Sequence, residues 1–191
     1  MTLQKTTKHT LYIGLGTLLF FGLGGVIIVE HVQGQNFMDL LGEGVALHWQ
    51  LLYGLLAGAA GSGVALLIIT RSFFKNELAY YSGLISRLDL NGAGMVFLSL
   101  CAGIGEELFF RAGIQPLLGI WWTSVIFVGL HGYLNPMNMR ISVYGLVLIN
   151  VIAGFGYLFD TVGIFSAMTA HAFFDLVLFV ALHKEQKSQT G

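Results

Sequence analysis

Six ionisable side chains in the second half of this sequence lie within long apolar runs, where charged groups are rare. A charge at membrane depth costs about 2.5–3.5 kcal/mol on insertion scales, so it is retained where it has a partner or a function. Carboxylates and imidazoles act as general bases, general acids and metal ligands in hydrolysis. The pattern therefore predicts one buried polar site. Its candidate residues are Glu106, Glu107, Arg111, His131, His171 and Asp175.

The spacing of these residues predicts which of them share a helix face. Glu107 and Arg111 are four residues apart, so they can form an ion pair on one face. Glu106 lies about 100° around the same helix and can point to a different neighbour. His171 and Asp175 are also four residues apart, so the carboxylate can orient or charge the imidazole. Each pair alone could be purely structural, and it is their conjunction on three predicted helices that indicates a site.

The charges of the set require compensation. Three carboxylates accompany one guanidinium, and a surplus of two negative charges cannot stay uncompensated in a low dielectric. Either carboxylates or histidines take up protons, or a divalent cation binds. Both outcomes produce a site suited to hydrolysis.

Three short motifs in this region carry a family resemblance. Residues 106–111 (EELFFR) resemble the E-E-x-x-x-R motif of the CAAX-protease and bacteriocin-processing (Abi) intramembrane proteases. Residues 127–131 (FVGLH) resemble the F-x-x-x-H motif of that family, and residues 171–175 (HAFFD) resemble its H-x-x-x-N/D motif. The order of the motifs agrees, and the resemblance covers about residues 93–182. It implies an intramembrane peptidase that cleaves a peptide or protein in or at the lipid bilayer.

The resemblance also implies a role for each site residue. Glu106 would be the general base on a water that His131 helps to hold, and His171 with Asp175 would stabilise the tetrahedral oxyanion. Some family members have Asn at the last position, and an ionised Asp cannot donate a hydrogen bond as Asn can. Asp175 would therefore serve the oxyanion only when protonated. Otherwise it orients His171 or helps to hold a metal.

A metal-dependent variant of this mechanism stays open at the level of sequence. In that variant Glu106, His131 and His171 are the ligands of one Zn²⁺, a His₂Glu set. In the variant without metal, Glu107 and Arg111 brace the helix and tune Glu106. The sequence has no H-E-x-x-H, which argues against a zinc protease of the site-2 type.

The elements that must position these residues are long apolar helices. The chain is 55% hydrophobic and only 10% charged, whereas soluble domains carry about 25% charged residues. Each apolar run approaches the roughly 20 residues that a spanning helix needs. The predicted fold is therefore an all-α, multi-pass transmembrane bundle of about six spans. These are residues 11–29, 47–70, 93–113, 117–134, 141–159 and 162–183.

The distribution of Lys and Arg predicts the orientation of the bundle. With the N-terminus in the cytoplasm, eight of the nine Lys and Arg residues fall on the cytoplasmic side, and residues 30–44 on the outer side have none. We expect both termini to be cytoplasmic, in a bacterial cell membrane. The net charge of −1 without basic blocks argues against nucleic acid. The expected organisation is an N-terminal part (1–92), a catalytic core (93–183) and a cytoplasmic tail (184–191).

Two further features leave alternatives open. Residues 77–88 have apolar side chains at helical spacing and are either an interfacial helix or an ordinary loop. Gly54, Gly58, Gly61 and Ala65 give the second span a face of small residues, which serves either packing within the chain or dimerisation.

Other functions compete with the peptidase hypothesis. Residues 60–63 (AGSG) approach the rhomboid G-x-S-G motif without its first glycine, and the presenilin G-x-G-D motif is absent. A non-enzymatic reading is a proton or ion path, or a scaffold or immunity protein, because intramembrane carboxylates and histidines also serve such roles. For the peptidase, we expect a water-filled cavity between the third, fourth and sixth spans, open to the cytoplasm.

Overall fold

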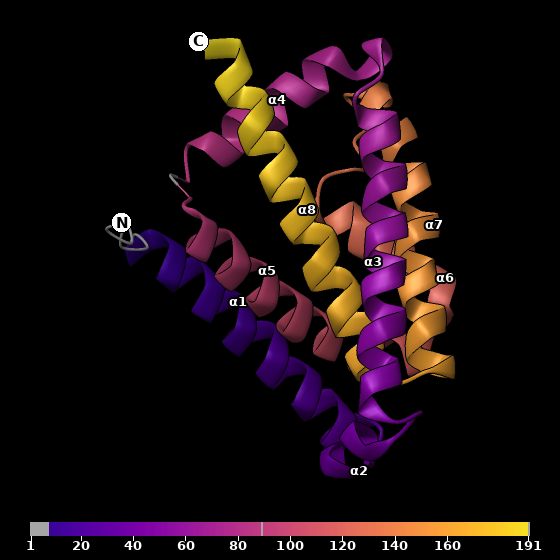
Figure 1. Ribbon diagram of the computed structural model, residues 1–191. Helices are drawn as coiled ribbons and strands as arrows, with labels where there is room; N and C mark the ends of the chain where they lie inside the picture. The colour runs from indigo at the N-terminus through magenta and orange to yellow at the C-terminus, as the bar shows by residue number, and fades with distance from the viewer. Residues whose placement is uncertain (1–7, 89, 191) are drawn as a thin grey trace.

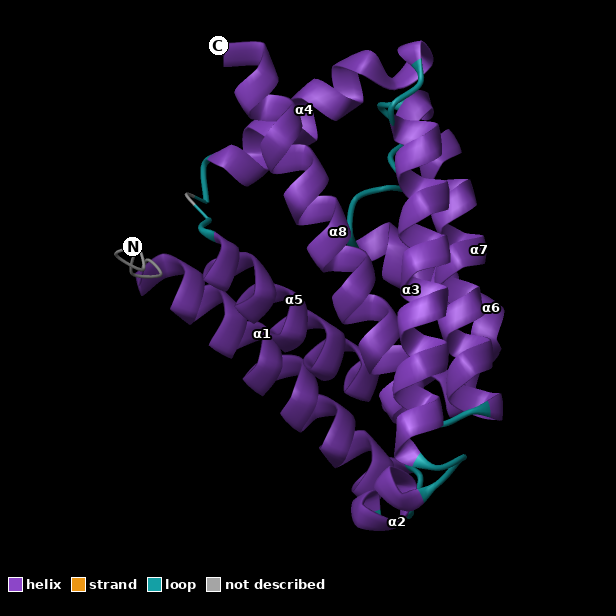
Figure 2. Cartoon of the chain, viewed as in Figure 1, coloured by secondary structure: helices purple, strands orange, loops and turns teal. Residues whose placement is uncertain are grey.

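The computed structural model describes residues 8–88 and 90–190, and this part of the chain consists of helices joined by loops, without strands (Figures 1 and 2). Wide π-helical turns interrupt or extend two of the long helices. The elements are α1 (Lys8–Ile27), η1 (Ile28–Val32), α2 (Phe37–Gly42), α3 (Leu47–Ile69), η2 (Ser72–Phe74), α4 (Lys75–Ser86), α5 (Gly92–Glu107), η3 (Leu108–Ile114), α6 (Gln115–Leu130), α7 (Met139–Thr161) and α8 (Ile164–Thr190).

Five helical segments are long and apolar enough to cross a membrane, within the residues described. Four of them correspond to predicted spans one, two, five and six. The fifth segment, Gly92–Leu130, has 39 residues and contains the third and fourth predicted spans. An all-helical membrane bundle is therefore confirmed.

The turn between the third and fourth spans lies at Gly119, not at residues 114–116 as the hydropathy pattern predicted. Gly119 has φ 78° and ψ 165°, a left-handed backbone conformation that glycine adopts without steric cost. The helix after it ends at Leu130 rather than Leu134. This half-helix is only about 16 Å long at 1.5 Å per residue, about half the thickness of a bilayer core.

The helix continues past Pro116 because its freed carbonyls find another donor. A proline inside a helix removes one hydrogen bond and displaces the carbonyl four residues earlier. Here the side-chain Nε2 of Gln33 donates to the carbonyl oxygens of Ala112 and Gly113, both at 2.8 Å. The end of the first span thus satisfies backbone groups that lipid could not.

The reversal at Gly119 sets the depth of the site. Glu106 lies 13 residues before this glycine and His131 lies 12 residues after it, so the two arms of the hairpin bring them to the same level. From His131 the chain continues as a loop to the start of α7 (Figure 2). His131 is therefore the C-cap of a half-length helix.

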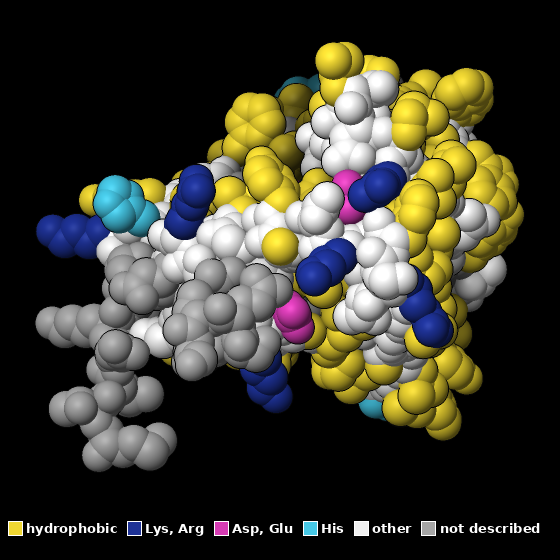
Figure 3. Space-filling view, turned by 90° about the horizontal axis from the view of Figure 1, so that it is seen from above, with side chains coloured by type: hydrophobic (Ala, Val, Ile, Leu, Met, Phe, Trp, Pro, Cys, Tyr) yellow, Lys and Arg dark blue, Asp and Glu magenta, His cyan; other side chains and the backbone are white. Residues whose placement is uncertain are grey.

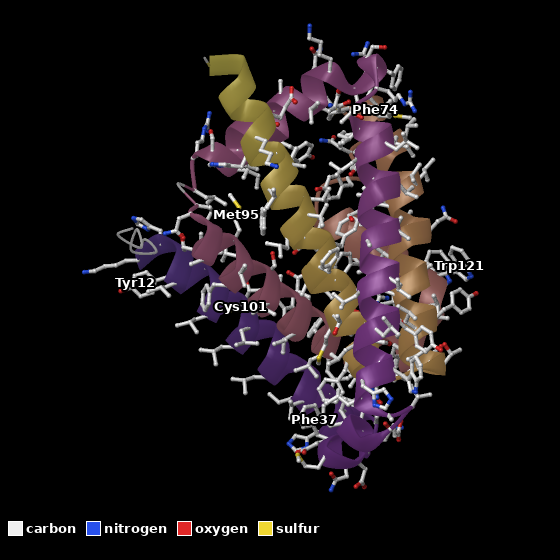
Figure 4. The ribbon with its side chains drawn as sticks, viewed as in Figure 1. Tyr12, Phe37, Phe74, Met95, Cys101 and Trp121 are labelled. Atoms are coloured by element: carbon white, nitrogen blue, oxygen red, sulfur yellow. The ribbon has the colours of Figure 1, made fainter. Side chains whose placement is uncertain are left out.

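The outward surface of the bundle is apolar, as lipid contact requires. Large side chains stand exposed on several helices, including Phe20, Leu67, Trp122 and Leu146. Figure 4 shows Trp121 directed away from the bundle beside α7. Polar and ionisable side chains lie instead inside, among them Glu107 and Arg111, both fully buried.

Small residues let the outer helices approach the inner ones. A Cβ on Gly54 or Gly58 of α3 would lie 2.6 or 2.5 Å from a backbone oxygen of α8, and one on Gly25 of α1 would lie 2.4 Å from the Leu108 oxygen. The small-residue face of the second span thus packs within the chain. It holds α3 against α8, next to the polar site.

One end of the bundle is crossed by α4 and carries basic side chains. Residues 77–88 are helical for most of their length, and α4 runs across the end of α8 rather than along it (Figure 1). Lys and Arg side chains gather on this face (Figure 3). Lys5, Asp89 and the side chain of Lys187 lie outside the described residues.

Candidate active site

Three helical elements bring the predicted site residues together in the interior. The end of α5 supplies the two glutamates, α6 ends at His131, and α8 supplies His171 and Asp175. The chain widens into the π-helix η3 directly after Glu107. Such wide turns are frequent at functional sites because they displace side chains from the regular helix rows.

Glu107 is the centre of a buried ionic cluster. Its Oε2 accepts a hydrogen bond from Arg111 Nε at 2.9 Å, and its Oε1 lies 2.8 Å from His171 Nδ1. The side chains of Glu107 and Arg111 have no exposed surface, and that of His171 is 4% exposed. The pair predicted on one helix face is therefore present, with a third partner from α8.

Glu106 points to a different neighbour, the imidazole of His131. The Oε2 of Glu106 lies 3.3 Å from His131 Nε2. On the other side of the ring, Nδ1 lies 2.8 Å from the carbonyl oxygen of Phe127. A carbonyl only accepts, so Nδ1 carries a proton and Nε2 faces the carboxylate. At 3.3 Å the two groups lie close without a hydrogen bond, since Glu106 Oε2 has no hydrogen-bond partner within the described residues.

His171 lies between two carboxylates. Its Nδ1 contacts Glu107, and its Nε2 lies 3.5 Å from Asp175 Oδ2. Each ring nitrogen of His171 can donate to a carboxylate oxygen when it carries a proton. The contact with Asp175 is longer than the usual N–H···O range, so the Nε2 proton is only weakly engaged.

The contacts pair each carboxylate of the set with a basic group. Arg111 and His171 lie against Glu107. His171 also faces Asp175, and His131 faces Glu106.

The aromatic ring of Phe127 forms a common wall of the site. It stacks on His131 with ring centroids 4.3 Å apart and meets His171 edge-on at 5.5 Å. The guanidinium carbon of Arg111 lies 5.9 Å from the centre of the same ring. Phe127, the first residue of the second motif, thus contacts a group on each of the three elements.

Gln115 is a site residue that the sequence analysis missed. Its Oε1 accepts from Arg111 Nη1 at 3.2 Å, and its Nε2 donates to the Gly156 oxygen at 3.0 Å and to Asp160 Oδ1 at 2.8 Å. It is 3% exposed. The available signal was its spacing of four from Arg111, which continues the row begun by Glu107.

A pocket of about 490 Å³ reaches His131 from the end of the bundle that α4 crosses. Its walls are one face of α4, the loop after α6 and the start of α7, not the third and sixth spans as expected. The reason is the early end of α6, which leaves the loop rather than a helix beside His131. The lining residues are Asn76, Glu77, Tyr80, Tyr81, Leu84, His131, Gly132, Asn135, Asn138 and Ile141.

The donor atoms do not form the His₂Glu zinc set considered from the sequence. No group of three His, Cys, Asp or Glu side chains is arranged to hold a metal ion within the described residues. Both ring nitrogens of His171 face carboxylates, and Nδ1 of His131 is held by a carbonyl. We therefore derive no step through a metal.

Comparison with known proteins places the site in a matched segment. Residues 90–177 match the family model described as type II CAAX prenyl endopeptidase Rce1-like, which confirms the resemblance of the three motifs. The uncharacterized protein YpbD of Bacillus subtilis (strain 168) is 33% identical over 85 residues. That alignment covers 44% of this chain and 42% of YpbD. No solved structure matches the chain.

Proposed function

We propose that this chain, whose residues 90–177 match the Rce1-like family model, is an intramembrane endopeptidase in which Glu106 activates the attacking water. The observation that carries the proposal is the Glu106–His131 contact. A buried carboxylate lies 3.3 Å from an imidazole whose other nitrogen is already fixed, and that imidazole lines a pocket. A carboxylate held beside an imidazole in this way can act as a general base.

In the proposed reaction, a water molecule binds beside Glu106 and His131 and loses a proton to the Glu106 carboxylate as its oxygen attacks the peptide carbonyl. The protonated Glu106 then passes this proton to the leaving amine, so the carboxylate is regenerated. His131 Nε2 holds the attacking water in place. No group outside the chain is required for this proton balance.

The developing oxyanion would be stabilised by the weakly engaged Nε2–H of His171. Asp175 is ionised in this scheme, so it charges and orients His171 rather than donating to the oxyanion. Glu107 fixes Nδ1 of the same imidazole at 2.8 Å, and Arg111 fixes Glu107. These two residues are positioning residues behind the reacting groups.

We propose the cell membrane as the location, with both termini in the cytoplasm and the α4 end of the bundle facing inward. The substrate would be a peptide or protein segment at the membrane. The matched family is described as a type II CAAX prenyl endopeptidase. Peptides ending in a prenylated Cys-aliphatic-aliphatic-X sequence are therefore the first class to test.

The experiment compares wild type and Glu106→Gln in proteoliposomes with prenylated and unprenylated peptides of that form. We expect Glu106→Gln to lower cleavage by at least about a hundredfold, the lower range for loss of a general base, with an unchanged melting temperature. Glu30→Gln, an exposed carboxylate at the other end of the first span, is the matched control and should cleave normally. Full cleavage by Glu106→Gln would reject the general-base assignment, and transport without cleavage would favour an ion path.

A further inference from the structure

The pocket that ends at His131 contains a carboxylate that the proposed reaction does not use. Glu77, in the first turn of α4, is 7% exposed. Its Oε1 accepts a hydrogen bond from Asn138 Nδ2 at 3.2 Å, which ties α4 to the loop before α7. Its Oε2 has no hydrogen-bond partner among the described residues.

No cation of the described chain compensates Glu77. Within residues 8–88 and 90–185, no Lys, Arg or His nitrogen lies within 4 Å of its carboxylate. The rest of the pocket wall offers neutral polar groups, the amides of Asn76, Asn135 and Asn138. A buried carboxylate with one oxygen unsatisfied attracts a positively charged donor strongly, because its solvation has already been lost.

The pocket is large enough for a side chain of the substrate. Its volume of about 490 Å³ corresponds to roughly 16 water molecules at 30 Å³ each. Glu77 and His131 line the same space, so a peptide bond held at His131 brings its neighbouring residues within reach of Glu77. An extended peptide advances only about 3.3 Å per residue.

We infer that the pocket between α4 and the loop after α6 is a specificity subsite in which Glu77 binds a Lys or Arg side chain within a few residues of the cleaved bond. The inference rests on the proposed function, since it names a feature of the substrate of that site. One oxygen of Glu77 keeps its structural bond to Asn138, and the other receives the cation. The tyrosine rings of Tyr80 and Tyr81, which also line the pocket, can cover the aliphatic stem.

The test uses a fluorescent peptide series in which one Lys, or one Nε-acetyllysine, is moved along a neutral background. Acetylation removes the charge and keeps the stem. With wild type we expect one position at which Lys gives about ten- to a hundredfold higher kcat/KM than acetyllysine. In Glu77→Gln this ratio should fall to about one. Glu43→Gln, an exposed acid at the end of α2, should keep the full ratio.

A binding measurement separates this inference from the proposed function. The Kd of the same peptides is measured on Glu106→Gln protein, with and without Glu77→Gln, so no turnover is needed. A preference for Lys that disappears with Glu77→Gln supports the subsite even if no peptide is cleaved. Equal Kd values for Lys and acetyllysine peptides on Glu106→Gln protein, or a preference that survives Glu77→Gln, would overturn it. A third outcome is cleavage that Glu106→Gln abolishes but that is equal for Lys and acetyllysine peptides. It would support the peptidase and reject the Glu77 subsite.

Discussion

Arg111 and Glu107 are completely buried and form the central ion pair of the site. Removing one partner of a buried pair leaves an uncompensated charge, which costs about 3–5 kcal/mol. We therefore expect Arg111→Ala to lower the melting temperature and the folded yield strongly, in addition to any loss of activity. Thermal unfolding of the purified protein in detergent is the measurement.

The double variant Glu107→Gln with Arg111→Ala distinguishes charge from packing. It removes the stranded charge, so it should recover part of the stability lost in Arg111→Ala. Arg71→Ala is the control, because this arginine is exposed and its side chain donates to the Leu67 carbonyl oxygen. If the double variant is no more stable than Arg111→Ala, the loss comes from the missing volume and not from the stranded carboxylate.

For individual residues, the sequence predicts contacts within one helix better than contacts between helices. The spacing of four predicted the Glu107–Arg111 contact, because helix geometry alone determines it. It could not predict that His131 meets Glu106 or that His171 meets Glu107, since those distances depend on how α6 and α8 pack. Gln115 was missed for the same reason, because its partner Asp160 lies on α7.

The approach of α5 to α8 depends on a glycine one turn before Glu107. A Cβ on Gly103 would lie 2.8 Å from the backbone nitrogen of Ala172 and from the carbonyl oxygen of Met168. Backbone atoms cannot move aside as a flexible side chain can, so Gly103→Ala must push the two helices apart. We expect kcat to fall more than KM changes, because the Glu107–His171 contact lengthens, and stability to fall by about 1–3 kcal/mol.

The control is Gly154→Ala on α7, where no atom lies within 4 Å of the added Cβ. Alanine favours a helix over glycine by up to about 1 kcal/mol, so this variant should be at least as stable as wild type and fully active. Kinetics and thermal unfolding of both variants provide the comparison. Normal kcat in Gly103→Ala would show that the reacting groups do not require this close contact.

Hydropathy located the helices but not the place where the chain turns. The predicted boundary between spans three and four lay at residues 114–116, which include Pro116, and proline is a usual stop signal. That signal fails here because Gln33, from the distant end of the first span, satisfies the carbonyls that the proline frees. The actual turn needs only one left-handed residue, Gly119, and glycine is too common in this chain, at 26 residues, to single it out.

For the whole molecule, the half-length of α6 explains how a site at membrane depth can contact water. A full fourth span would have covered His131 with helix, whereas the short one leaves a loop and a polar pocket under α4. His131 is accordingly 37% exposed on its side chain, while His171 is only 4% exposed. The pocket therefore opens to His131 from the α4 end of the bundle.

The side of the membrane that this pocket faces is testable with two single cysteines of nearly equal exposure. Tyr80 on α4 lines the pocket and is 68% exposed, and Met38 on α2, at the other end of the bundle, is 70% exposed. Both are placed in a Cys101→Ser background, because Cys101 is the one cysteine of the chain.

The basic side chains around α4 predict that its end faces the cytoplasm. Tyr80→Cys should then react with a membrane-impermeant thiol reagent in inside-out vesicles, and Met38→Cys should react in right-side-out vesicles. The reverse pattern would reject both the orientation and entry of substrate from the cytoplasm.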